Sequence, residues 1–363
     1  MQRLQSIDIL KLFAMFLVLW GHCVQFMLTS HYLDEPAYIY IYSFHMPLFF
    51  MISGLFVHSS MPMAADFGKQ LLTRARQLLL PCLAWGVLMS LGNLVQPMIN
   101  GTTSEHSLWY TLMWNFWFLK SLFVCFALWL VSILLLRKRW LALAVSLLVS
   151  QCITAWEVQW SYPAFAIGVL IGPYLSTIRL RRKPIALTTF LIGGILLLGW
   201  NKSYFLIPSV WSWSTLAADA IIMSVAMRIY RIFIGASLSL GFLALFLGLE
   251  ERLQTTAVTS INAVEPKTII RPAQLFAARL ADWGKLTLGI YIIHTLFIIV
   301  RERLFPTLLC CDSLNPWLFN IVIAPLSAAV LLLVSVGLTR LITLLPRLSF
   351  FLLGTPWPKR QSA

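Results

Sequence analysis

The sequence predicts an all-α integral membrane protein, a polytopic bundle of about ten transmembrane helices. Hydrophobic residues make up 60% of the 363-residue chain and charged residues only 11%, whereas a typical soluble protein has about 25% charged residues. Apolar runs of roughly 20 residues, the length that a helix needs to cross a bilayer, recur along the whole chain. Basic residues stand in short clusters between these runs, as the positive-inside rule expects.

The spans follow from hydropathy and from the charges that flank them. The N-terminus is expected in the cytoplasm, and a first span at residues 9–28 leads outward to a loop that holds acidic but no basic residues. A second span at 38–57 returns to a basic loop at 58–76. The remaining spans are expected at about 77–97, 112–136, 141–156, 162–178, 185–200, 232–249, 285–300 and 317–339.

One apolar segment, residues 214–227, leaves the topology open. Only Arg228 to Arg231 separate it from the next apolar run, so both segments can cross, which makes eleven spans, or the first can lie along the surface or re-enter. Positive-inside counting favours ten spans, because the basic loop at 250–284 and the C-terminus then both lie in the cytoplasm. We therefore expect one transmembrane domain over residues 1–345 and a cytoplasmic tail over residues 346–363.

Composition also excludes several functions. The formal charge of +14 arises from the clusters between spans, so we expect no nucleic-acid partner. The six cysteines form no C-x-x-C pair and show no metal-ligand spacing, so neither a disulfide framework nor a metal site is expected. The first apolar run lacks an A-x-A cleavage site, which argues against a removable signal peptide.

The first two spans carry ionisable side chains at membrane depth. Lys11 and His22 lie eleven residues apart, so on a helix they share a face and differ by about 16 Å in depth. His45 in the second span lies at a depth similar to that of His22, so the two imidazoles can share one cavity. Such residues usually face a protein interior, a cavity or a partner. The structural alternatives are that Lys11 reaches the headgroups or pairs with Asp8, and that His22 is a hydrogen-bonded interior residue.

Further candidates follow along the chain. Arg74 and Arg76 precede the third span, where they serve either as a topology anchor or as a clamp for phosphate or carboxylate. Lys120 lies well inside the fourth span, and a buried ammonium needs an acceptor. Tyr291 and His294 share a helix face near mid-depth in a later span. Candidate sugar-stacking aromatics are Trp109, Trp114, Trp211 and Trp213, although interfacial aromatic belts also use tryptophan.

Together these segments resemble membrane-bound acyltransferase family 3, whose members O-acylate carbohydrates. The Lys11-x10-His22 pattern resembles the family's Arg-x10-His signature. FHMPLFFMISG, RQLLLPCLAW, WFLKSLF and LGIYIIH are similar to other family segments and follow in the family's order. Two departures stand out. Lys11 replaces the usual arginine and loses its planar fork, and Arg74-x-Arg76 is followed by Gln77 where the family often has arginine nearer the proline.

The resemblance implies an acyltransferase of a bacterial cytoplasmic (inner) membrane that moves an acyl group, most readily acetyl, from acetyl-CoA to a carbohydrate or glycolipid acceptor. His22 would act as general base or transient acyl carrier, and His45 would orient groups or share protons. Lys11, Arg74 and Arg76 match the phosphates of coenzyme A, and Lys120 and Tyr291 would stabilise the oxyanion. The alternative is a transporter of a sugar or glycan precursor, since polar inner faces and broken helices serve transport equally well.

Overall fold

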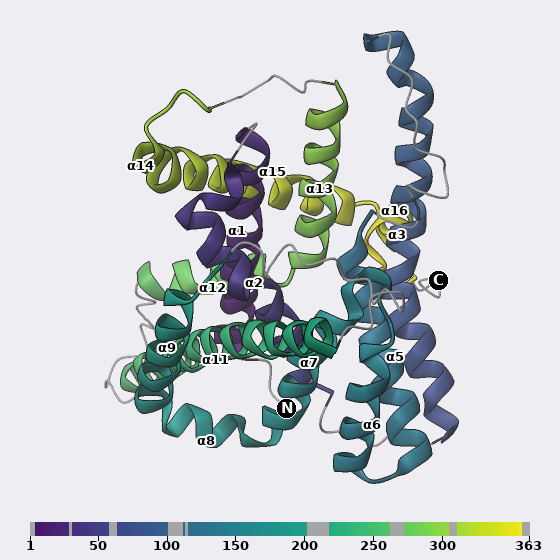
Figure 1. Ribbon diagram of the computed structural model, residues 1–363. Helices are drawn as coiled ribbons and strands as arrows, with labels where there is room; N and C mark the ends of the chain where they lie inside the picture. The colour runs from purple at the N-terminus through teal and green to yellow at the C-terminus, as the bar shows by residue number, and fades with distance from the viewer. Residues whose placement is uncertain are drawn as a thin grey trace.

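The computed structural model describes residues 4–28, 31–57, 64–100, 112, 115–201, 218–261, 272–304 and 311–357. All regular secondary structure in these ranges is helical (Figure 1), which confirms the all-α prediction. Six helical stretches in this part of the chain are long and apolar enough to cross a membrane. They are Gln5–Met27 (α1), Pro36–Leu55 (α2), Trp117–Leu136 (α5), Ala155–Leu180, Val225–Leu249 and Pro316–Thr343.

Other helices complete the bundle. Two shorter apolar helices are Arg139–Gln151 (α6) and the first part of Thr287–Leu304 (α13). The third and seventh predicted spans are covered by Ala64–Asn100 (α3) and Arg182–Leu198 (α9). The stretch at 155–180 contains two α-helices, Val158–Ile171 (α7) and Leu175–Leu180 (α8), each preceded by a short 3-10 turn. Ala324–Thr343 (α15) forms most of the last span. The predicted total of ten spans stays a prediction.

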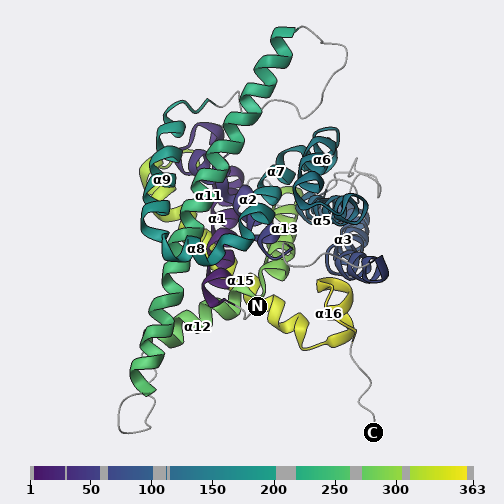
Figure 2. The ribbon, with the colours of Figure 1, turned by 90° about the horizontal axis from the view of Figure 1, so that it is seen from below.

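The doubtful segment before Arg228 belongs to one long helix. Residues Ala218–Ile261 form α11, which continues without a break through Arg228–Arg231 (Figure 2). A continuous helix does not reverse direction, so residues 218–227 make no crossing of their own beside the one at 232–249. The eleven-span arrangement required a reversal at those arginines, and the described helix lacks it.

The first helix is the centre of the molecule. α1 packs against α2, α11, α13, α15 and Pro272–Gly284 (α12). In Figure 2 it lies between α3, α5 and α6 on one side and α9 and α11 on the other. Its side chains are apolar on nearly all sides, as expected of a helix that is surrounded by others. Residues on α1 are therefore held in the interior rather than at the lipid boundary.

Two glycines set the position of α2 against α7. A Cβ on Gly54 would lie 2.1 Å from the Phe165 carbonyl oxygen, and a Cβ on Gly168 would lie 2.1 Å from the Met51 carbonyl oxygen. Only glycine therefore permits this backbone approach, which is a common device for packing membrane helices. The contact fixes the position of α2, and the same helix carries His45, nine residues before Gly54.

The segment expected as a tail begins with a docked helix, Pro346–Leu353 (α16). The Trp85 indole on α3 donates a hydrogen bond to the Leu352 carbonyl at 3.0 Å. α16 ends at Gly354, whose φ of +62° is the left-handed conformation that suits glycine at a helix C-terminus. Residues 358–363 lie outside the described residues, and the cytoplasmic location of the tail stays a prediction.

Candidate functional site

A cavity of about 460 Å³ opens beside the C-terminal third of α1. We call it the histidine cavity, because His22 from α1 and His45 from α2 both line it. Helices α5, α7 and α11 complete its wall with two tryptophans, Trp117 and Trp160, and several polar groups. Its polar lining comprises His22, Gln25, Tyr42, Ser43, His45, Glu157, Ser161 and Arg231. The similar depth of the two histidines predicted such a shared cavity, and the structure contains it.

His22 is joined to a short polar chain. The Tyr42 hydroxyl donates to Gln25 Oε1 at 2.8 Å and lies 3.4 Å from His22 Nδ1. Because the hydroxyl proton is directed to Gln25, the oxygen accepts, and we assign a proton to His22 Nδ1. His22 Nε2 is then the unprotonated, basic nitrogen of the neutral ring.

His45 is fixed by its own helix. Its Nδ1 lies 2.7 Å from the Ile41 carbonyl oxygen, which can only accept, so Nδ1 carries the proton and Nε2 is an acceptor. Pro47 stands two residues further along α2 and packs against Gly235 of α11, where a Cβ would meet the proline ring at 2.7 Å. The ring of His45 lies 4.8 Å from that of Tyr42, measured between centroids.

His294 and Tyr291 on α13 approach His22 from another side. The centroids of the His22 and His294 rings are 5.4 Å apart, and the Tyr291 ring lies 5.5 Å from that of His294. His294 is fully buried and donates from Nδ1 to the Ile290 carbonyl at 3.0 Å. Its Nε2 has no hydrogen-bond partner among the described residues. The structure thus brings together all three predicted histidines and Tyr291 through ring contacts.

Lys120, by contrast, is engaged by backbone. Its Nζ donates to the carbonyls of Leu112 and Asn115, the latter at 2.5 Å, and lies 5.9 Å from the Trp156 ring centroid. The histidine cavity is lined by its helix α5 through Trp117, not through Lys120. Lys120 therefore holds the turn before α5, in which Phe116 has a left-handed φ of 56°.

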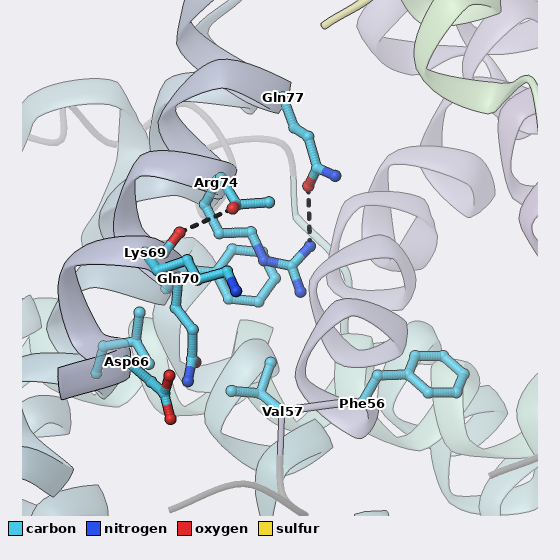
Figure 3. A pocket seen from close by; sticks show the side chains of 10 residues that line it. Phe56, Val57, Asp66, Lys69, Gln70, Arg74 and Gln77 are labelled. Carbon is cyan, nitrogen blue, oxygen red and sulfur yellow. Dashed lines mark hydrogen bonds between the residues drawn. The ribbon is translucent and has the colours of Figure 1, made fainter. Parts of the chain in front are cut away.

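The N-terminal end of α1 lies near a second cavity. Lys11 pairs with Asp8 at 3.4 Å, as the structural alternative expected, and its Nζ lies 5.6 Å from the Phe56 ring centroid. Phe56 lines a cavity of about 410 Å³ together with Lys69, Gln70 and Arg74, which we call the arginine cavity (Figure 3). Lys11 and His22 thus belong to opposite ends of α1, about 16 Å apart along its axis.

Arg74 is the central cation of the arginine cavity. Its guanidinium donates to Gln77 Oε1 at 3.2 Å (Figure 3). The guanidinium also lies over the Phe126 ring, 4.5 Å from its centroid. Arg74 precedes the predicted span at 77–97, and burial lowers the pKa of its guanidinium. Arg76 is not among the residues that line this cavity, and its carbonyl lies against Gly354 instead. The structure therefore separates the two predicted clamp arginines.

Several residues of the site escaped prediction. Gln25 and Tyr42 follow from helical spacing, because each lies three positions from a predicted histidine on the same helix face. Glu157, Trp160 and Arg231 have no such signal, since only the packing of α7 and α11 brings them to the cavity. Within the described ranges, no three His, Cys, Asp or Glu side chains form a group that could hold a metal ion. The predicted stacking residues Trp109, Trp114, Trp211 and Trp213 lie outside the described residues.

Comparison with known proteins gives the family. Two curated relatives are the nodulation proteins NolL of Mesorhizobium japonicum, 28% identical over 216 residues, and of Sinorhizobium fredii, 25% identical over 214 residues. Each alignment covers 55% of this chain, and the chain spans 57% and 58% of the two relatives' lengths. No solved structure matches. A family model described as an acyltransferase domain matches residues 4–340, so the chain belongs to that acyltransferase family.

Proposed function

We propose that the protein transfers an acyl group, most readily acetyl, from acyl-CoA to a hydroxyl of a carbohydrate acceptor. The observation that carries the proposal is the polar chain from His22 through Tyr42 to Gln25 inside a cavity of molecular size. A neutral imidazole that donates a hydrogen bond from one nitrogen has a second, unprotonated nitrogen, which can remove a proton from a hydroxyl at neutral pH. Membership of the acyltransferase family supports the same reaction class.

In the proposed reaction, His22 Nε2 removes the proton of the acceptor hydroxyl. The oxygen forms a bond to the thioester carbonyl carbon, the C–S bond breaks, and the departing thiolate takes the proton from His22. The ester and the free thiol of coenzyme A are the products, and His22 returns to its neutral form. The Tyr42 oxygen accepts a hydrogen bond from Nδ1–H throughout and so stabilises the charged ring between the two proton transfers.

The neighbouring groups have supporting roles in this proposal. His45, with Nδ1 held by Ile41, presents Nε2 to a second acceptor hydroxyl. Tyr291 contacts the His294 ring but does not line the histidine cavity, so we assign it a positioning role in place of the oxyanion role. We assign Lys120 a positioning role in place of the oxyanion role, because two carbonyls already engage its ammonium.

The donor is proposed to enter at the opposite end of α1. Lys69 and Arg74 in the arginine cavity, with Lys11 nearby, provide cations for the phosphates of coenzyme A. Lys11 and His22 are separated by about 16 Å along α1, so a donor whose phosphates bind near Lys11 would extend its thioester end toward His22. The proposed location is a bacterial inner membrane with both termini and the arginine cavity on the cytoplasmic side, as the flanking charges favour.

The test uses isolated membranes, acetyl-CoA labelled in the acetyl group, and a matched pair of variants. His22→Asn should reduce label transfer by about 10²–10⁴-fold, the usual contribution of a general base, while the protein still inserts. His31→Asn is the control, because its side chain is 84% exposed and asparagine tolerates its left-handed φ of 62°. Unchanged transfer in His22→Asn, or label that stays on coenzyme A in the native protein, contradicts the proposal.

A further inference from the structure

A second, apolar hollow lies next to the histidine cavity. This groove of about 520 Å³ runs between α6, α7 and α11. Leu147, Leu148 and Leu170 in its lining are exposed on the surface of the helix bundle, where they would face lipid. Its side chains are aliphatic apart from Gln151 and Arg228. We call it the aliphatic groove, and its chemistry suits a hydrocarbon chain.

The groove and the cavity share a wall on α11. Ile232 lines both hollows; Arg228, one turn before it, lines the groove, and Arg231, the residue just before it, lines the histidine cavity. Both guanidiniums lie over the ring of Trp160, at 5.2 and 4.0 Å from its centroid. Two cations thus converge on one aromatic side chain at the boundary between an apolar and a polar hollow.

Both arginines lie within a candidate membrane span, Val225–Leu249, where a cation is energetically unfavourable. Arginines are rare within membrane spans, and those that occur there usually mark a ligand path. Arg228 is 8% exposed, and its Nη1 contacts the neutral amide oxygen of Gln151 at 3.5 Å. Glu157 in the same cavity carries the opposite charge and interacts with Arg231. Among the described residues that line the two hollows, the charged side chains are these two guanidiniums and the Glu157 carboxylate.

The planar guanidinium groups of Arg228 and Arg231 also match the geometry of a phosphate group. Stacking on an aromatic ring holds a guanidinium by its face, whereas its five N–H donors lie in its plane and match phosphate oxygens in pairs. Trp160 therefore orients the arginines without using the geometry by which they bind an anion. A phosphate at this point would lie between a hydrocarbon in the groove and a sugar in the histidine cavity.

We propose that the acyl acceptor is a glycolipid in which phosphate links the sugar to its hydrocarbon chain. The chain lies in the aliphatic groove, the phosphate binds Arg228 and Arg231, and the sugar presents a hydroxyl to His22. This inference rests on the proposed acyl transfer for its last part only, since the binding of the lipid, phosphate and sugar does not depend on the reaction.

The experiment measures binding to the purified full-length chain by native mass spectrometry with three probes. They are farnesyl phosphoryl glucose, farnesyl glucoside, which lacks the phosphate, and phosphatidylglycerol as a bulk anionic lipid. The phosphate-linked probe should bind about ten-fold or more tightly than the glucoside, as expected for charge-assisted hydrogen bonds. Equal affinity for these two probes, or equally tight binding of phosphatidylglycerol, overturns the proposal.

Variants locate the site. The double variant Arg228→Gln with Arg231→Gln should remove the preference for phosphate and leave the affinity for the glucoside unchanged, which also verifies that the protein is folded. Leu147→Trp, which fills the groove from its exposed side, should weaken both farnesyl probes. Arg181→Gln, an exposed arginine between α8 and α9, is the matched control and should change nothing. A phosphate preference that survives in the double variant refutes the assignment.

Failure of the proposed function is distinguishable from failure of this inference. His22→Asn should keep the full preference for the phosphate-linked probe while acyl transfer is lost. A protein that prefers this probe but transfers no label from acetyl-CoA supports the glycolipid site and contradicts the acyl-transfer proposal.

Discussion

The imidazole rings of His22 and His294, which come from the first helix and from one near the end of the chain, lie 5.4 Å apart. His294 is fully buried with Nδ1 bound to the Ile290 carbonyl, so only its Nε2 is available to a neighbour. In the proposed acyl transfer, an acceptor nitrogen beside His22 would favour the charged form of its ring. This ring contact therefore places His22, the proposed base, against a fully buried side chain of α13.

The first prediction concerns this pair. His294→Phe keeps an aromatic ring and removes the buried nitrogen, so kcat should fall by about 10–100-fold, which corresponds to the loss of one interaction with a charged group. Substrate binding should change little, because His294 does not line the histidine cavity. Steady-state kinetics in detergent measure both quantities. An increase in KM with an unchanged kcat would show that His294 acts on binding instead.

The second prediction concerns the Tyr42 hydroxyl, which links His22 to Gln25. Tyr42→Phe keeps the ring contacts with His45 and removes the acceptor that holds His22 Nδ1, so kcat should fall by about 2–10-fold, the value of one hydrogen bond. Tyr40→Phe is the control, since Tyr40 is exposed on the same helix. If both variants retain full activity, the polar chain has no part in orienting His22.

Much of this arrangement follows from residue pattern. The second span was expected at 38–57, and the helix is Pro36–Leu55, because an apolar run of that length has few alternatives to a helix in lipid. The common depth of His22 and His45 followed from counting residues. Helical periodicity gives the face and depth of a side chain, but it does not give the helix that packs against it.

The remainder depended on tertiary contacts. The charges at Arg228 and Arg231 suggested a possible loop, whereas both side chains lie on Trp160 of α7 and the helix continues through them. Lys120 is predicted to lie well inside a span at 112–136, whereas it stands in the first turn of α5, and the carbonyls that engage its ammonium precede that helix. In both cases the partner of a buried cation decides its role, and a sequence does not name that partner.

The third prediction concerns packing between α2 and α7. Gly54→Ala places a methyl group 2.1 Å from the Phe165 carbonyl oxygen, so the two helices must move apart. Overpacking of this kind costs about 1–3 kcal/mol, and the thermal unfolding midpoint should fall. Gly337→Ala is the matched control, because no atom lies within 4 Å of the added methyl group. Its midpoint should stay or rise, since alanine is the better helix former. Equal midpoints for the two variants would contradict the close approach.

The last prediction concerns recognition of the donor. Arg74→Gln removes the cation at the centre of the arginine cavity, so KM for acetyl-CoA should rise by about 10–100-fold, as expected for lost hydrogen bonds to a charged group, with kcat little changed. Arg76→Gln should have a smaller effect, because Arg76 does not line that cavity. Repeating the kinetics with acetyl-dephospho-CoA, which lacks the 3′-phosphate, identifies the contact. If Arg74 binds this phosphate, its removal from the donor raises KM in the native protein but not further in Arg74→Gln. Independent, multiplicative effects would mean that Arg74 binds another part of the donor, and no effect of Arg74→Gln on KM would remove the arginine cavity from donor binding altogether.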